Sequence, residues 1–482
     1  MSIATDIDLR ARLGGVATIG ASGLEVQDEA ALRGELMDEL AFAAVFHDDE
    51  AMRDAARWII WSASQAIGCG SASIHELYRA RGRGEVPATA FTVPAINVRA
   101  STYLTARQAF AAALERDAAT VIFEIAKSEM SYTDQRPAEY TAVILAAAMR
   151  SGWRSPVFLQ GDHFQFNATK WAVDPDAELD GLRDLTREAV AAGFLNIDID
   201  SSTLVDLSQP TVAEQQRVNA ENTAALTRLV RELQPDGVTI SVGGEIGEVG
   251  KSNSTEGELR AYLDGYLERC AGVEPISKVS IQTGTSHGGV PMPDGSIAAV
   301  SIDFDTLRRL STVAREEYGM AGCVQHGAST LPDDAFDHFP ANGTAEIHLA
   351  TGFQNILYDG GGLPDGLRAE MMEWCVANCA DERKEGETDE QFLYKTRKKA
   401  IGPFKRRLWT LPTAAAEEIG ANLRAKFGLL FDELGIAGTR ELVERHVTRV
   451  AIPRPLPSAL GGEGRAAVRA GAAVFEDDGS GE

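Results

Sequence analysis

The 482-residue chain is poor in positive charge, with 46 Lys and Arg residues against 71 Asp and Glu residues and a formal net charge of −25 at pH 7. Nucleic acids and anionic membrane surfaces attract proteins that carry a basic face. We therefore expect no nucleic acid and no membrane partner. Any anion that this protein binds must be held by a few local groups.

Cysteine and long apolar runs are also scarce. The five cysteines form no CxxC pair and no zinc-ribbon spacing, which favours reduced thiols. No apolar run approaches the roughly 18 residues of a membrane span, and the opening MSIATDIDLR lacks the apolar stretch of a signal peptide. These absences predict a cytoplasmic protein.

The middle of the chain alternates short β-rich runs with helical stretches. Eight such runs are present, at residues 91–98, 120–126, 156–162, 194–200, 239–247, 279–284, 322–327 and 345–351. Their number and even spacing predict an α/β fold, a (β/α)8 TIM barrel over residues 89–363. A doubly wound open sheet is the alternative.

The segments on either side of the predicted barrel differ from it in pattern. Residues 1–88 and 364–450 have helical periodicity and are expected to form N-terminal and C-terminal helical extensions. Residues 451–482 are rich in Pro, Gly, Ala and charge, which predicts a flexible tail.

Three of the eight histidines stand where a predicted barrel strand ends: His163, His287 and His326. A single histidine at such a place is more often packed or hydrogen-bonded than a ligand. Three at the C-terminal mouth of one barrel converge on one space, and three imidazoles can hold a catalytic zinc ion. We therefore predict a divalent metal site at this mouth.

Acidic residues follow the same strands. Asp162 precedes His163, Asp198 and Asp200 end the fourth run, and Glu245 lies in the fifth. Each alone could be a solvated loop charge or a helix cap. Together with the histidines they could orient metal ligands and transfer protons.

Two loops combine small residues with a histidine, Ser286-His287-Gly288-Gly289 and His326-Gly327-Ala328-Ser329. Glycine lets backbone N–H groups approach an anion, and late barrel loops often bind phosphate. Glycines of ordinary tight turns are the alternative. A phosphate held in this way is compatible with the acidic composition.

In this order, the motifs VPAINV, Asp162-His163, NIDIDSS, EIG, TGTSHGG and HGAS resemble those of the class II, metal-dependent fructose-bisphosphate aldolases. The resemblance covers about residues 91–352, with a further basic, proline and Arg-x-Trp element that ends at Arg407-Leu408-Trp409. It implies a lyase that cleaves fructose 1,6-bisphosphate reversibly to dihydroxyacetone phosphate and glyceraldehyde 3-phosphate through a metal-stabilised enediolate, in glycolysis and gluconeogenesis.

The resemblance also implies a role for individual residues. Zn2+ or another divalent metal would bind His163, His287 and His326, with Glu245 at an alternative metal position, Asp200 nearby, and room for a second metal or a monovalent cation. Asp162 would handle a proton. Gly288, Gly327 and Ser329 would hold one phosphate, and Asn97 and Arg407 would lie near the far end of the substrate. Relatives of this kind form homodimers or homotetramers.

Several positions depart from the family pattern. Ser252 and Asn253 stand where the family has an acid/base glutamate pair, so Glu256 or Glu258 could serve only after a realignment. The last strand reads Glu346-Ile347-His348 instead of Lys-x-Asn, which makes His348 a further candidate for proton transfer. Gln160 replaces a histidine, and no lysine on a central strand is a persuasive Schiff-base candidate.

These departures leave two alternatives open. One is a related aldolase that acts on another ketose phosphate, of the tagatose type or a deoxy sugar. The other is a non-catalytic, aldolase-like subunit that binds a sugar phosphate.

Overall fold

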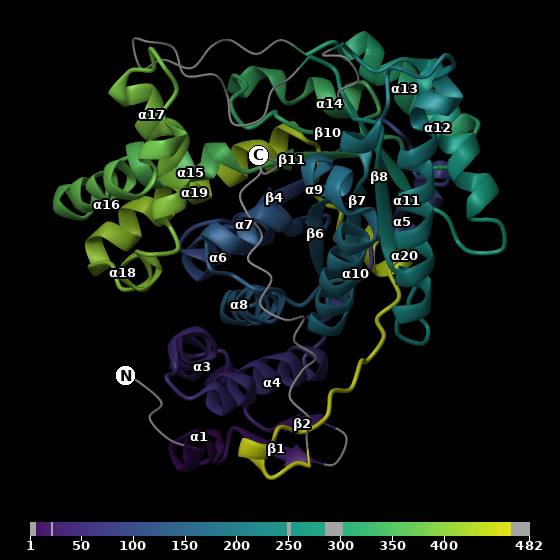
Figure 1. Cartoon of the computed structure of the whole chain (residues 1–482). Helices are drawn as coiled ribbons and strands as arrows, with labels where there is room; N and C mark the ends of the chain where they lie inside the picture. The colour runs from purple at the N-terminus through teal and green to yellow at the C-terminus, as the bar shows by residue number, and fades with distance from the viewer. Residues whose placement is uncertain (1–5, 21–22, 248–251, 285–301, 464–482) are drawn as a thin grey trace.

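The computed structural model describes residues 6–20, 23–247, 252–284 and 302–463. Its centre is a closed barrel of eight parallel strands (Figure 1). Each predicted run overlaps one strand: β4 (Val93–Asn97), β5 (Ile122–Ala126), β6 (Val157–Gln165), β7 (Asn196–Asp200), β8 (Ser241–Glu245), β9 (Lys278–Ile281), β10 (Cys323–Gln325) and β11 (Glu346–Leu349). The hydrogen bonds between β6 and β7 close the circle, which confirms the barrel and excludes the open sheet.

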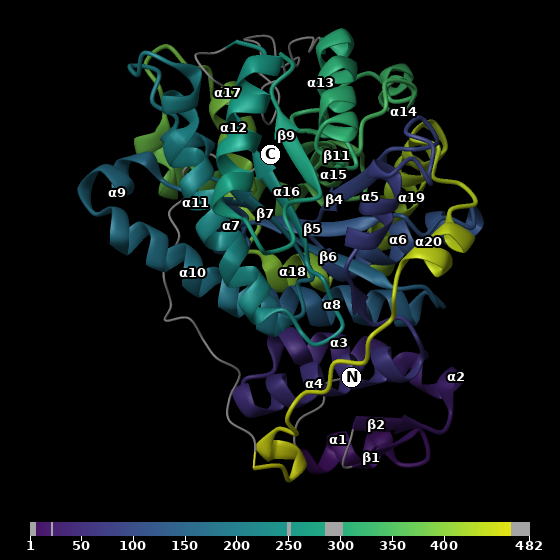
Figure 2. The same cartoon turned by 90° about the vertical axis from the view of Figure 1, so that its right-hand side faces the viewer.

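Helices follow the strands and surround the barrel (Figure 2). Several of these helices begin after a residue whose side chain accepts a hydrogen bond from a backbone N–H of the first turn, such as Asp174, Thr211 and Asp303. The helices of this part are α6 (Thr102–Glu115), α7 (Lys127–Tyr132), α8 (Pro137–Arg150), α9 (Ala168–Val173), α10 (Pro175–Ala192), α11 (Val212–Leu233), α12 (Glu256–Arg269), α13 (Phe304–Glu316), α14 (His338–Ala341) and α15 (Thr351–Asp359).

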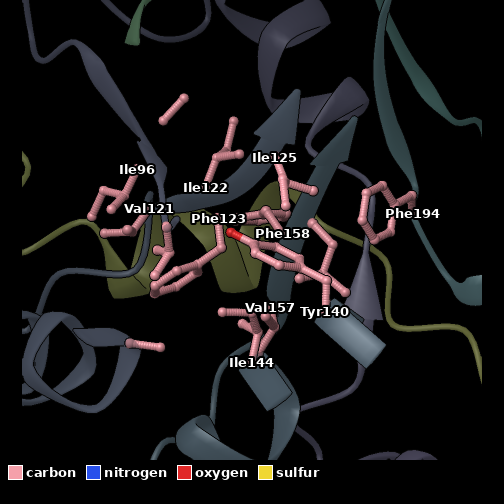
Figure 3. Packing of buried hydrophobic residues seen from close by; sticks show 14 of the residues in the cluster. Ile96, Val121, Ile122, Phe123, Ile125, Tyr140, Ile144, Val157, Phe158 and Phe194 are labelled. Carbon is pink, nitrogen blue, oxygen red and sulfur yellow. The ribbon is translucent and has the colours of Figure 1, made fainter. Parts of the chain in front are cut away.

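Apolar side chains fill the space between the barrel and its helices. Figure 3 shows Phe123, Phe158, Tyr140 and Ile144 packed where β5 and β6 meet α8. All four are buried, and the Tyr140 hydroxyl donates to the Glu124 carbonyl at 2.5 Å. Burial of each such side chain contributes roughly 1.5–3 kcal/mol, so this layer holds the strands in register.

The N-terminal extension is mostly helical but also contains strands. Its elements are α1 (Asp6–Leu13), β1 (Ala17–Gly20), β2 (Gly23–Val26), α2 (Glu29–Leu32), α3 (Glu35–Phe46), α4 (Glu50–Ala66), β3 (Ser71–Ala72) and α5 (His75–Gly82). The hairpin β1–β2 differs from the expected all-helical pattern, because ATIG and GLEV alternate in burial as strands do. Strand β3 pairs with β6, and α3 and α4 pack against α8.

The C-terminal extension contains α16 (Asp365–Asn378), α17 (Asp389–Thr396), α18 (Lys405–Trp409), α19 (Thr413–Glu433) and α20 (Arg440–His446). Residues 451–463, which the sequence assigned to a tail, run along the N-terminal helices (Figure 2). They are held there because the indoles of Trp58 and Trp61 donate to the carbonyls of Arg454 and Ile452. Among the described helices, none is both long and apolar enough to cross a membrane.

Candidate metal centre and its ionic network

His163 lies at an irregular point of β6. The pairing of β6 with β7 shifts register between Gly161 and Phe164, and His163 has a φ of 39°. A residue other than glycine is rarely found in this left-handed region, and such strain is concentrated at functional sites. The bulge places Asp162 and His163 next to each other at the carboxyl ends of the barrel strands, where barrel active sites lie.

Five predicted residues meet at this point, and we call them the His163 site: Asp162, His163, Asp200, Glu245 and His326. The ring centroids of His163 and His326 lie 4.3 Å apart. Asp162 Oδ1 lies 3.9 Å from Nε2 of each ring. Donor atoms of Asp162, His163 and His326 all fall within 4.8 Å of one another, so they can hold one ion.

Neighbouring groups fix how the two rings are turned. His163 Nδ1 lies 3.2 Å from Asp200 Oδ2 and 3.4 Å from Glu245 Oε2. His326 Nδ1 lies 3.0 Å from the Ser280 hydroxyl. Both Nε2 atoms therefore face Asp162. A carboxylate on the far nitrogen is the usual way in which a protein orients a metal-binding histidine.

The charges in the His163 site are strongly coupled. Burial alone would lower the pKa of His163, yet the carboxylates around it, Asp162 first among them, hold it well above its ordinary value. Burial alone would raise the pKa of Asp162, but His163 and His348 hold it below its ordinary value. Burial, reinforced by Asp200, raises the pKa of Glu245 to about 8. The site thus favours a positive charge at its centre.

The donor set fits a divalent cation. Both carboxylate oxygens of Asp162 are buried and make no hydrogen bond within the described residues. A buried carboxylate needs a positive charge nearby, which the protonated His163 and His348 rings supply here and which a metal ion could supply in place of the His163 proton. Imidazole nitrogen with carboxylate oxygen suits zinc and similar divalent ions. His163 and His326 would hold such an ion, and the Asp162 carboxylate would lie beside it.

A second cluster, the Lys278 network, crosses the barrel interior and consists of Tyr78, Glu124, Gln160, Asp198, Lys278, Glu346 and His348. Lys278 Nζ donates to Gln160 Oε1 at 2.8 Å, to Asp198 Oδ2 at 2.9 Å and to Glu346 Oε1. Gly243 leaves room for the ion pair, since a Cβ there would meet Asp198 Oδ1 at 2.3 Å.

Lys278 is a buried lysine on a barrel strand, where the sequence offered no persuasive Schiff-base candidate. It is the first residue of β9, one position before the run that the sequence marked as a strand. Burial lowers its pKa, but Asp198 and Glu346 more than offset this and raise it above the ordinary value. A lysine held protonated by two carboxylates is a poor nucleophile, so Lys278 is unsuited to Schiff-base formation.

His348 connects the Lys278 network to the His163 site. Its Nε2 lies 2.7 Å from Glu346 Oε1. Its Nδ1 lies 3.2 Å from both Glu124 Oε1 and Asp162 Oδ1. The His348 and His326 ring centroids are 4.2 Å apart. This predicted residue is therefore next to Asp162 and fully buried.

The structure pairs the other acid/base candidates elsewhere. Glu256 begins α12 and forms a 3.0 Å ion pair with Arg260 on the half-exposed helix face. Glu258 completes a capping box with Thr255. Asn253 donates to Asp303 at 3.1 Å. In these positions neither glutamate contacts the His163 site.

The predicted substrate-binding residues that the structure describes lie in different surroundings. Asn97 ends β4 and donates to Glu129 Oε2 at 2.5 Å. Gly327 has a φ of 68°, and the Ser329 hydroxyl accepts the Ala350 N–H at 2.7 Å. Arg407, on α18, forms an exposed ion pair with Glu370. His287 and Gly288 lie outside the described residues.

Sequence reasoning missed Tyr78, Glu124 and Lys278 as parts of the site. Glu124 carried a usable signal, because an acid in the middle of the apolar run TVIFEIA must face the barrel interior or a partner. Tyr78 carried no such signal in the sequence, because only the packing of α5 brings its hydroxyl to Glu346 Oε2.

Residues 85–404 match the family model for fructose-bisphosphate aldolase class-II. No curated protein matches the chain. The solved structures that are similar to it include three that are named as enzymes. A probable tagatose 6 phosphate kinase from Sinorhizobium meliloti 1021 is 18% identical, with a TM-score of 0.50 over 74% of this chain and 99% of that chain.

The second is a fructuronate-tagaturonate epimerase from Cohnella laeviribosi, 10% identical, with a TM-score of 0.53 over 79% of this chain and 86% of that chain. The third is a fructose-bisphosphate aldolase from Campylobacter jejuni, 17% identical, with a TM-score of 0.45 over 77% of this chain and 97% of that chain. At these identities the structural likeness concerns the fold alone.

Proposed function

Because the chain belongs to the class II fructose-bisphosphate aldolase family, we propose that it is a metal-dependent aldolase that reversibly cleaves fructose 1,6-bisphosphate to dihydroxyacetone phosphate and glyceraldehyde 3-phosphate. The observation that carries this proposal is the donor group of Asp162, His163 and His326 at the carboxyl ends of the barrel strands. When bound there, a divalent ion supplies a Lewis acid for the ketone being cleaved.

Asp162 is suited to the proton transfer. Aldol cleavage needs a base for the hydroxyl proton on the far side of the scissile bond, and the same group can return a proton to the aldehyde in the reverse reaction. Asp162 is an ionised carboxylate, since His163 and His348 lower its pKa, and its role as a base rests on its position beside the histidines rather than on that shift. Oδ1 faces His348 Nδ1 at 3.2 Å, whereas Oδ2 makes no hydrogen bond within the described residues and is available to a substrate.

A different group must protonate the carbanion carbon after cleavage. Glu245 lies 3.4 Å from His163, and burial raises its pKa to about 8, so it can carry a proton near neutral pH. We assign it this role ahead of Glu256, whose carboxylate pairs with Arg260 on the helix surface. Gly327 and Ser329 would contribute to a phosphate site in the loop after β10.

The first test is cleavage of fructose 1,6-bisphosphate by protein loaded with Zn2+. We expect activity that a chelator removes and zinc restores, and that His163→Ala or His326→Ala reduces at least 100-fold, because each removes a donor of the site. His338→Gln, which changes an exposed histidine, is the matched control. A zinc-loaded, folded protein that cleaves no ketose phosphate would refute the proposal.

A related aldolase with another ketose phosphate as substrate is the second candidate. The Lys278 network favours it, because Glu346 and His348 fill the last strand with groups that differ from the family's Lys-x-Asn pattern. Dihydroxyacetone phosphate offered with a panel of aldehydes separates the two, since the preferred aldehyde identifies the substrate. Exchange of a C3 proton of dihydroxyacetone phosphate with solvent would exclude a non-catalytic subunit.

A further inference from the structure

His348 is held by its two nitrogens in different ways. The 2.7 Å contact to Glu346 Oε1 has hydrogen-bond geometry, so Nε2 carries the proton that Glu346 accepts. Nδ1 faces two carboxylates, Glu124 Oε1 and Asp162 Oδ1, at 3.2 Å each, with a poorer hydrogen-bond geometry than Nε2 has towards Glu346. The contact with Glu346 is the shortest of the three and the one with hydrogen-bond geometry, so it is the best-defined constraint on the ring.

Glu346 is itself fixed by three donors from different parts of the fold. Oε1 accepts from Lys278 on β9 and from Gln160 on β6 at 2.9 Å, and Oε2 accepts from Tyr78 on α5. All of these side chains are fully buried. A carboxylate held at both oxygens by a closed set of donors has one position, and it transmits that position to the ring that it accepts from.

We propose that Glu346 and Lys278 are positioning residues of this enzyme, which orient His348 so that its Nδ1 faces the Asp162 carboxylate. The expected effect on catalysis rests on the proposed function, whereas the contacts that orient His348 do not. Neither Glu346 nor Lys278 forms a hydrogen bond or ion pair with Asp162 within the described residues. The charge of Lys278 reaches Asp162 at longer range, whereas the position of the nearest ring is set through His348. A ring turned away from Asp162 would leave the carboxylate without its nearest cationic neighbour and free to rotate.

Kinetics of fructose 1,6-bisphosphate cleavage test the consequence. We expect Glu346→Gln and Lys278→Met to lower kcat about 10- to 100-fold, as is typical when the support of an active-site histidine is removed. KM should change less than about threefold, because neither residue belongs to the predicted phosphate-binding set. Lys426→Met is the matched control, since Lys426 pairs with Asp333 at the surface.

The double variant Lys278→Met/Glu346→Gln separates positioning from mere stability. It removes Lys278 together with one of its two carboxylate partners, so its urea midpoint should lie above that of Lys278→Met but below that of the unchanged protein, because Asp198 keeps a buried charge without its cation. We expect kcat to stay low, because the charged acceptor of His348 Nε2 is still missing. Recovery of kcat together with the midpoint would overturn the proposal. If Lys278→Met does not fold, Tyr78→Phe weakens the same support and leaves both charges in place.

A spectroscopic measurement decides the geometry without catalysis. In zinc-loaded protein with 15N-labelled histidine, the signals lost in His348→Gln identify the His348 nitrogens. We expect a proton fixed on Nε2 in the unchanged protein and a shifted or exchange-broadened pair of signals in Glu346→Gln. Unchanged signals would overturn the proposal. An inactive protein with the expected signals would instead refute the proposed function alone.

Discussion

Glu129 holds the β4 side of the barrel mouth, and its replacement by Gln should destabilise the fold strongly. Its Oε1 accepts from Arg99 at 2.6 Å, and its Oε2 accepts from Asn97 at 2.5 Å and from the Ala126 N–H at 2.8 Å. Glu129 is 0% exposed and Arg99 2%. A glutamine at this position keeps one acceptor oxygen, which will face Asn97 and the Ala126 N–H. Its NH2 group must then face the Arg99 guanidinium, which is a donor as well.

The loss is large because the remaining charge is buried. Removing one partner of a buried ion pair costs about 3–5 kcal/mol, whereas an exposed pair contributes about 0–1 kcal/mol. Glu370→Gln supplies the matched control, because it removes the carboxylate from an Arg–Glu pair whose side chains are 49% and 53% exposed. Urea unfolding followed by tryptophan fluorescence measures both free energies. A loss below about 1 kcal/mol for Glu129→Gln, or equal losses for the two variants, would refute the reasoning.

Three further predictions concern the metal, the substrate and the C-terminal segment. His163 has a raised pKa and stays protonated above its ordinary range in the absence of metal, so ion binding must release a proton. The affinity for zinc should therefore rise with pH between 6 and 8, by about tenfold per pH unit for each proton released. Calorimetry in buffers of different ionisation enthalpy measures that proton, and a pH-independent affinity would contradict it. Arg407→Ala should raise KM for fructose 1,6-bisphosphate several-fold with kcat nearly unchanged, if its guanidinium exchanges Glu370 for the far phosphate; an unchanged KM would remove Arg407 from the site. A chain that ends at residue 450 should lose roughly 2–5 kcal/mol of unfolding free energy, because the Trp58 and Trp61 indoles lose their hydrogen-bond acceptors and become partly exposed. Trp61→Phe should lower the free energy of unfolding by about 1 kcal/mol. A truncated chain with the same urea midpoint as the full-length chain would be evidence against the contact.

The fold was readable from the sequence because its signal is periodic. Each of the eight strands overlaps a short apolar run, although β6 continues beyond its run and β9 begins one residue before it, and turn residues or helix caps lie between the strands. The hairpin β1–β2 escaped this reading, because its two strands have four residues each and lie between helices. Residues 452–460 escaped it too, since their proline-rich composition is typical of a tail while their contacts depend on distant tryptophans.

The candidate site was readable in part. Asp162, His163, His326, Asp200 and Glu245 follow strand ends, and parallel barrel strands bring all such ends to one mouth, so their meeting could be predicted without coordinates. Glu256 showed the limit of that reasoning. Its distance from the strand end made it a candidate, but the capping geometry of α12 turns it towards Arg260.

The sequence by itself determined the barrel, the position of its mouth and the residue types that gather there, because strand order and alternation follow from local pattern. Only the tertiary structure decided which charges neutralise one another. Lys278, Glu346 and Tyr78 come from β9, β11 and α5 and meet inside the barrel, at separations of up to 268 residues. Such contacts depend on the tilt and register of all eight strands together, which no local segment encodes.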